Sequence, residues 1–251
     1  MSGHLTVCLM PWGRVGSNLL NSIIARGRNV VVYNEPLTRI DSRGRKSGES
    51  RKQIWTAQRD WLAENIVQPD TDSTVFLNLS AVHVLRAAAF AKLIAPRKPT
   101  YIVLDRRDDL ATAVSALRTR AWVDEGAAIG EKRTWAIPKD ARVDFRPNID
   151  PKALVDAVQI IQNGRDTITQ ITTAAKATPT VYYYEDLVFD MTGVVADVFA
   201  KSRIPFYGFD VKSGKFGSAR LADMVANPDA LAKTVADHAI ATQLELPEVK
   251  P

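Results

Sequence analysis

Short apolar runs alternate along this chain with longer segments in which apolar residues recur at helical spacing. Five runs have the length and β-branched content of buried strands: residues 5–10, 29–33, 74–79, 100–105 and 180–184. Helical spacing follows at 17–27, 54–66, 82–94, 109–122, 151–177, 191–202 and 228–243. The alternation predicts an α/β fold, with a central parallel sheet flanked by helices.

Two segments interrupt this pattern. Residues 38–52 are dense in Arg, Lys, Ser and Gly, and we predict a mobile surface loop there. Residues 123–150 contain glycines and prolines without a clear period, and we predict an excursion over the functional site. No internal repeat or linker is visible, so we expect a single domain over residues 1–251, with these two loop excursions.

Composition narrows the class of protein. Apolar residues make up 46% of the chain and charged residues 24%, which suffices for a sizeable core. The sequence shows no signal peptide and no integral membrane segment, and its single cysteine, Cys8, fits a reducing, cytoplasmic location. The net charge of +5 indicates an anionic partner. No aromatic and basic stripe accompanies this charge, so we do not expect nucleic-acid binding.

The junction between the first predicted strand and helix has the residues of a phosphate site. Gly13 and Gly16 let backbone N–H groups approach an anion, Arg14 adds a positive charge, and Ser17 and Asn18 add donors where the helix begins. A plain strand-to-helix turn with Ser17 as N-cap is the alternative. The loop lacks the Lys-Ser/Thr pair of a Walker A sequence, which favours a nucleotide handled without metal.

A second anion site is predicted after the fourth strand. Arg107 follows that strand, and Ser115 lies two turns into the next helix, so both could meet one phosphate. Surface pairing of the arginines with Asp105, Asp108 and Asp109 is the alternative. Two separate sites would suit a nucleotide with phosphates at two positions, such as 3′-phosphoadenosine 5′-phosphosulfate (PAPS).

With these two motifs in this order, the sequence resembles the PAPS-dependent sulfotransferases, and the bacterial and carbohydrate enzymes more than the steroid and phenol enzymes. The resemblance implies a P-loop-like sulfotransferase fold in which Arg107 and Ser115 contact the 3′-phosphate. It also places Tyr184, in Tyr-Glu-Asp-Leu, near the adenine, and makes Lys215 and Arg220 candidates in a segment that closes over the nucleotide. The 5′-phosphosulfate loop corresponds to Gly13, Arg14, Val15, Gly16, Ser17 and Asn18, where Val15 departs from the family's small hydroxyl residue.

The resemblance also implies an activity, the transfer of a sulfuryl group from PAPS to a hydroxyl with PAP as product. Arg14 would stabilise the leaving phosphate, and a general base would take the proton of the hydroxyl. Two residues compete as base: Glu35, whose Glu-Pro pair resembles the bacterial and carbohydrate members, and His83, which resembles the base of the steroid and phenol enzymes. We favour Glu35, and we expect Arg14 beside it to keep it ionised. A salt bridge from Glu35 to Arg14 or Arg39, and a partly buried structural histidine, are the alternatives.

The acceptor is expected to be a carbohydrate or another hydroxyl-bearing molecule, and the 38–52 segment is a hypothetical part of its site. The sequence indicates no metal site and does not define an oligomeric state. Two other functions stay open. One is a P-loop nucleotide kinase or NTPase with Asp105 as metal ligand, and the other is a PAP(S)-binding protein without catalysis.

Overall fold

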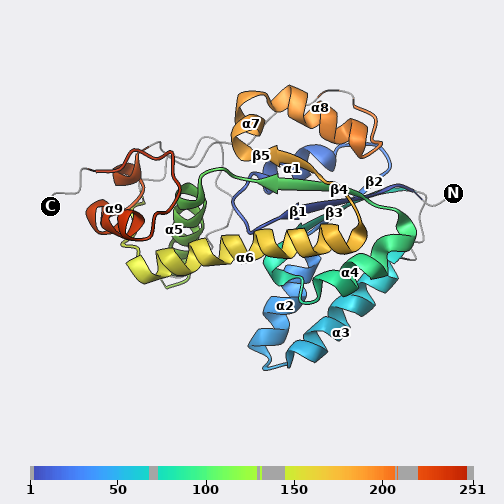
Figure 1. Cartoon of the computed structure of the whole chain (residues 1–251), viewed down its shortest axis with the longest axis horizontal. Coiled ribbons are helices and arrows are strands. Elements are labelled where there is room, and N and C mark those ends of the chain that lie inside the picture. The colour runs from blue at the N-terminus through green and yellow to red at the C-terminus, as the bar shows by residue number, and fades with distance from the viewer. Residues whose placement is uncertain are drawn as a thin grey trace. The chain divides into compact units, whose positions relative to one another are not determined.

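The computed structural model describes residues 3–67, 73–128, 131, 145–206, 208 and 220–247. Within them, five parallel strands form one sheet in the order β2-β3-β1-β4-β5 (Figure 1). The strands are β1 (Leu5–Met10), β2 (Val30–Asn34), β3 (Thr74–Ser80), β4 (Thr100–Asp105) and β5 (Thr180–Tyr183). Every predicted strand is present to within one residue at each end, and the predicted α/β class is confirmed.

Helices connect these strands. They are α1 (Ser17–Ile24), α2 (Pro36–Lys46), α3 (Arg51–Leu62), α4 (Ala87–Ile94), α5 (Asp109–Ala128), α6 (Pro151–Ala175), α7 (Tyr184–Phe189), α8 (Met191–Lys201) and α9 (Pro228–Asp237). Short 3-10 or π segments occupy Ala63–Val67, Ala81–His83, Ala95–Arg97 and Leu221–Asp223. None of the helices in the described part of the chain combines the length and apolarity needed to cross a bilayer.

The chain divides into two compact units, Met1–Asp105 with Gln162–Phe209, and Arg106–Ile161 with Asp210–Pro251. The first unit contains the sheet. The second contains α5, α9 and the beginning of α6, and the buried Asp108 organises it by accepting hydrogen bonds from the backbone N–H groups of Ala111 and Gln243, both at 2.7 Å. The expectation of a single domain stays a prediction.

In the first unit, each face of the sheet has its own apolar cluster, because successive side chains of a strand point to opposite faces. Leu5, Val7 and Leu9 of the central strand β1 pack into the cluster under α2, α3, α4 and the later part of α6. Cys8 and Met10 pack into the other cluster. Helices α1, α7 and α8 cover this face of the sheet (Figure 1). The sheet is therefore covered on both sides, as a parallel sheet requires.

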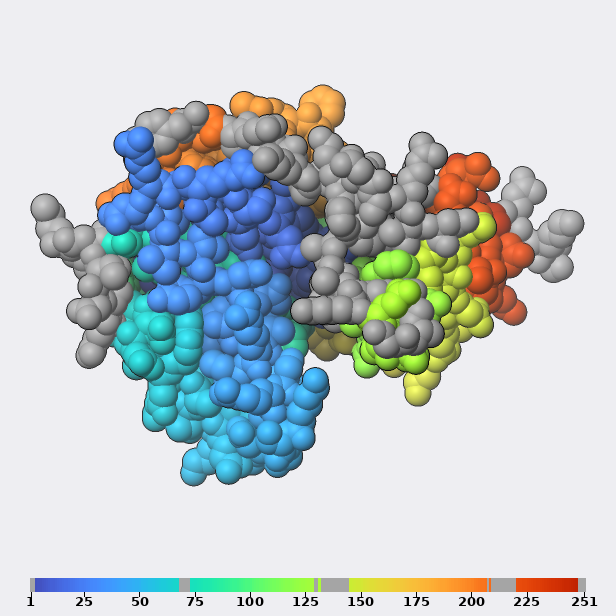
Figure 2. All heavy atoms as spheres, turned by 180° about the vertical axis from the view of Figure 1, so that it is seen from behind, coloured from blue at the N-terminus to red at the C-terminus, as the bar shows by residue number. Residues whose placement is uncertain are grey.

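The predicted loop over residues 38–52 is wrong, because α2 and the start of α3 occupy this segment. The inward face of α2 carries Leu37, Asp41 and Gly44, so its pattern lacks the apolar stripe that marks a helix. Gly44 allows the close approach of Ile54, since a Cβ there would lie 2.5 Å from Ile54 Cγ1. A capping box of Ser50 and Gln53 begins α3, and the two helices project together from the sheet (Figures 1 and 2).

Three other boundaries differ from prediction. The predicted helix over 82–94 begins only at Ala87, after a 3-10 turn. The last helix ends at Asp237 rather than near residue 243. In the predicted excursion over 123–150, α5 continues to Ala128, and residues 129–130 and 132–144 lie outside the described part.

Candidate active site

The loop after β1 contains two residues with left-handed backbone. Arg14 and Gly16 both adopt left-handed conformations, with φ of 72° and 87°. Between them, Val15 is 1% exposed and packs in the second apolar cluster, so only its backbone could face a ligand. Turns that mix left- and right-handed residues gather N–H groups into a concave donor site. Gly16 occupies the N-cap of α1 without a side-chain cap, so the alternative with Ser17 as N-cap is wrong.

Two close approaches hold this loop in place, and neither is visible in the sequence pattern. A Cβ on Gly16 would lie 3.0 Å from Cδ2 of Tyr184 and 3.2 Å from Cδ2 of Leu187. A Cβ on Gly164 of α6 would lie 2.7 Å from Cα of Pro11 and would overlap the Pro11 carbonyl. The structure therefore brings Tyr184, the predicted adenine neighbour, against the predicted phosphate loop.

Glu35 directly follows β2, at the same edge of the sheet as the loop after β1. Its backbone is left-handed, with φ of 50°, and its N–H donates to the carbonyl of Asn78 at 2.9 Å. Burial raises the pKa of Glu35, against the opposing effects of a hydrogen bond from Thr38 (3.2 Å) and of the charges of His83 and Arg39. We expected a carboxylate held ionised by Arg14. Instead, the pKa of Glu35 is raised. A carboxylate with a raised pKa is a stronger base once it is ionised.

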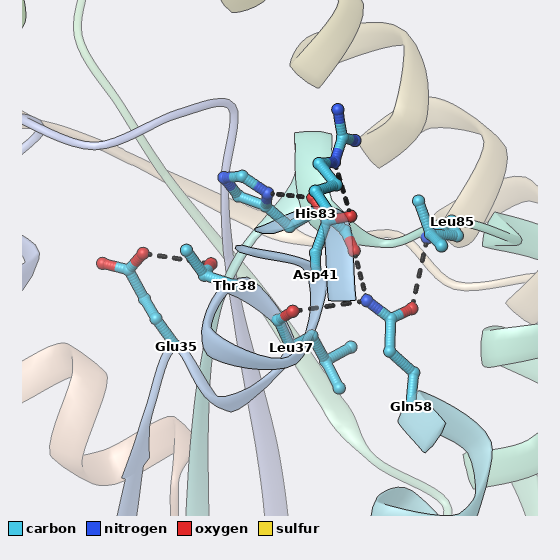
Figure 3. Close-up of polar contacts among 8 residues, drawn as sticks. Glu35, Leu37, Thr38, Asp41, Gln58, His83 and Leu85 are labelled. Carbon is cyan, nitrogen blue, oxygen red and sulfur yellow. Dashed lines mark hydrogen bonds and ion pairs between the residues drawn. The ribbon is translucent and has the colours of Figure 1, made fainter. Parts of the chain in front are cut away.

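His83 lies in the 3-10 turn after β3, and its electrostatic effect on Glu35 places the two competing bases in one neighbourhood. Its Nδ1 lies 2.7 Å from Oδ2 of Asp41, and Nε of Arg45 donates to Oδ1 of Asp41 at 2.8 Å (Figure 3). Although burial acts to raise the pKa of Asp41, the hydrogen bonds from Arg45 and His83 outweigh it and the pKa is lowered. Sequence reasoning did not find Asp41.

A buried amide cluster joins α1, β2 and β3 beneath this edge. Nδ2 of Asn21 and Nδ2 of Asn78 both donate to Oδ1 of Asn34, each at 2.9 Å. Asn78 is 0% exposed and Asn21 8%. The cluster therefore ties α1, which follows the phosphate loop, to the ends of β2 and β3, and Glu35 directly follows β2.

Asp105, the last residue of β4, pairs with an arginine of α6. Arg165 of α6 donates to its two carboxylate oxygens, from Nε at 2.8 Å and from Nη2 at 3.2 Å. This bidentate ion pair satisfies the carboxylate within the first unit. Asp105 is thus held through both oxygens by an arginine of α6 and is not presented as an open oxygen ligand.

The remaining predicted nucleotide residues belong to the second unit. Arg107 is exposed, and Ser115 is 5% exposed on α5, where its carbonyl accepts a hydrogen bond from Thr119. Arg220 is exposed, and its Nε atom lies 3.9 Å from Oε2 of Glu245. Lys215 lies outside the described residues.

The raised pKa of Glu35 predicts how Glu35→Gln changes stability. A buried carboxyl whose pKa is higher in the folded than in the unfolded protein costs stability as the pH rises through that folded pKa. We therefore expect Glu35→Gln to raise the free energy of unfolding at pH 7, because glutamine keeps an acceptor for Thr38 and carries no charge. Urea unfolding at pH 7 and at pH 4 measures this, and a gain that does not shrink at pH 4 contradicts the assigned cause.

Comparison with known proteins assigns no family. No model of a protein family matches the chain, and no curated protein is similar to it. Among solved structures, the chain is similar to a sulfotransferase domain from the olefin synthase of Synechococcus PCC 7002, with 13% identity, a TM-score of 0.45 and 96% of each chain covered. What the structure itself establishes is an α/β protein with a parallel sheet and with polar residues following the carboxyl ends of its strands.

Proposed function

We propose that this protein is a PAPS-dependent sulfotransferase that transfers a sulfuryl group to the hydroxyl of a carbohydrate or other small acceptor, without a metal ion. The observation that supports this most is the loop after β1. It combines two left-handed residues, a cationic side chain at Arg14 and the ring of Tyr184 against Gly16. Glu35 and His83 follow β2 and β3, the next two strands on one side of β1, at the same edge of the sheet.

The residues of this loop fit the 5′ end of the nucleotide. A Cβ at Gly16 would lie tightly against Tyr184, and the left-handed backbone strains any other residue, so the loop favours the glycine that the sequence provides. Gly13, Gly16, Ser17 and Asn18 would donate to the phosphate, Val15 through its backbone alone, and Arg14 would add charge. Arg107 and Ser115 would hold the 3′-phosphate, with Lys215 and Arg220 as further contacts. Bound PAPS would supply the activated sulfuryl group.

The protein's own part in the reaction is positioning and charge. Arg14 places a fixed positive charge where negative charge develops, and Glu35 removes the proton from the acceptor hydroxyl. Burial of Glu35 favours this step, because a carboxylate with a raised pKa binds the transferred proton more readily. The buried thiol of Cys8, whose pKa burial raises to about 12, takes no part in this chemistry.

The competing nucleotide kinase needs an oxygen ligand for magnesium at the end of β4. Asp105 is disfavoured in that role because Arg165 contacts both of its oxygens. Activity that survives a chelator would separate the sulfotransferase from the kinase. A protein that binds PAP without transferring a sulfuryl group would show affinity with no turnover for any hydroxyl acceptor.

Calorimetry with PAP tests the proposed function directly. We expect micromolar or tighter affinity, about −8 kcal/mol, and a loss of at least about tenfold in Arg107→Ala, which removes a charge-assisted phosphate contact. Arg120→Ala is the matched control, because Arg120 lies on α5 with its side chain 75% exposed. Absence of PAP binding, or an equal loss in both variants, contradicts the proposal.

A further inference from the structure

Asp41 is a buried acid with no part in the proposed chemistry. Its side chain is 1% exposed and lies on the inward face of α2, one turn beyond Leu37. Burying a carboxylate is costly unless hydrogen bonds compensate it. Both oxygens have a partner here, Arg45 on one and the imidazole of His83 on the other.

The backbone that carries His83 is also held. Nε2 of Gln58, a fully buried residue of α3, donates to the carbonyl of His83 at 2.7 Å and to the carbonyl of Leu37 at 3.3 Å. Its Oε1 accepts from the N–H of Leu85 at 3.4 Å. Two helices thus hold both the main chain and the ring of His83 (Figure 3).

This arrangement determines which ring nitrogen carries the proton. An ionised carboxylate only accepts hydrogen bonds, and Arg45 on Oδ1 favours the ionised form of Asp41. Nδ1 of His83 must therefore be the donor to Oδ2, so that Nε2 is an acceptor whenever the ring is neutral. In Figure 3 the ring lies on the side of Asp41 that faces Glu35, with Nε2 directed away from Asp41.

We propose that Asp41 is a positioning residue for the acceptor site: it holds His83 with its proton on Nδ1, so that Nε2 accepts a hydrogen bond from the acceptor molecule beside Glu35. This inference rests on the proposed sulfuryl transfer. It gives the two competing bases different tasks, since Glu35 takes the proton and His83 orients the acceptor. A merely structural Asp41 would join α2 to the end of β3 and leave acceptor binding untouched.

Asp41→Asn tests the tautomer first. Asparagine has the same shape and can donate to Nδ1, which would move the proton of His83 to Nε2. In ¹⁵N NMR at high pH we expect a protonated Nδ1 in the wild type and a protonated Nε2 in Asp41→Asn. His83→Gln assigns the signal among the chain's three histidines. A wild-type ring protonated on Nε2 overturns the proposal.

The kinetic test separates positioning from structure. In Asp41→Asn we expect the KM for the acceptor to rise about tenfold or more, from the loss of one buried hydrogen bond, while the affinity for PAP stays unchanged. The double variant Asp41→Asn/His83→Gln should match His83→Gln alone, because both act through one nitrogen. Lys92→Gln, an exposed change on α4 outside the proposed acceptor site, is the control.

The outcomes distinguish this inference from the proposed function. An unchanged acceptor KM in Asp41→Asn, or a loss that adds to that of His83→Gln, overturns the positioning role even if the wild type transfers sulfuryl groups. A wild type that neither binds PAP nor transfers a sulfuryl group refutes the proposed function, and the acceptor role of His83 falls with it. The NMR result then still shows whether Asp41 sets the tautomer.

Discussion

Replacing Arg14 with glycine is expected to lower kcat for sulfuryl transfer by about a hundredfold or more while the fold stays intact. The guanidinium would be the charge nearest the leaving phosphate, and no other cation of the loop 11–16 could replace it. Glycine suits the test because residue 14 has φ of 72°, a conformation that costs a non-glycine residue about 1 kcal/mol. Relief of this backbone cost should offset part of what the lost side-chain contacts contribute, so Arg14→Gly should still fold.

Two further variants isolate the charge at residue 14. Arg14→Lys keeps a cation but loses the planar fork, and we expect it to fall between the wild type and Arg14→Gly. Lys92→Ala removes an equal charge from the exposed side of α4 and should change neither rate nor melting temperature. If Arg14→Gly transfers sulfuryl groups at the wild-type rate, the loop after β1 is not the donor site.

The fold was largely predictable because its strands are short and almost wholly apolar. All six residues of β1 are buried, so its six-residue run could be recognised without any long-range information. Helix α2 could not be recognised in this way. Its inward positions include Asp41 and Gly44. Asp41 pairs with His83, and Ile54 packs closely against Gly44, and neither contact can be inferred from the local sequence.

Candidate site residues could be selected from the sequence only where they lie shortly after a strand. Glu35 and His83 could each be selected because the carboxyl ends of parallel strands meet at one edge. From the sequence, the two residues were alternatives for the role of general base. In the structure they are close enough for His83 to affect the pKa of Glu35, and their surroundings differ. Asp41 is separated from His83 by 42 positions, and no spacing rule connects an acid in a charged segment with a histidine after another strand.

Gly164→Ala is the second change with a large expected effect, and here local and tertiary reasoning disagree. Glycine inside a helix costs about 1 kcal/mol relative to alanine, so propensity alone predicts that the change stabilises α6. In the structure the new Cβ would overlap the carbonyl of Pro11, a backbone group that no side-chain rotation can move aside. We expect the overlap to dominate and to destabilise the protein by roughly 2–4 kcal/mol.

The same change should also weaken nucleotide binding, because Pro11 begins the loop that carries Arg14 and Gly16. Relief of the overlap requires α6 and this loop to separate, which disturbs the donor groups before the protein unfolds. Thermal unfolding and PAP calorimetry measure the two effects on one sample.

Gly13→Ala is the stability control within the loop. Its Cβ would meet nothing within 4 Å and its φ is not positive. Its free energy of unfolding should therefore stay within about 0.5 kcal/mol of the wild type. A higher melting temperature in Gly164→Ala would mean that helix propensity outweighs this contact, and that α6 does not support the phosphate loop.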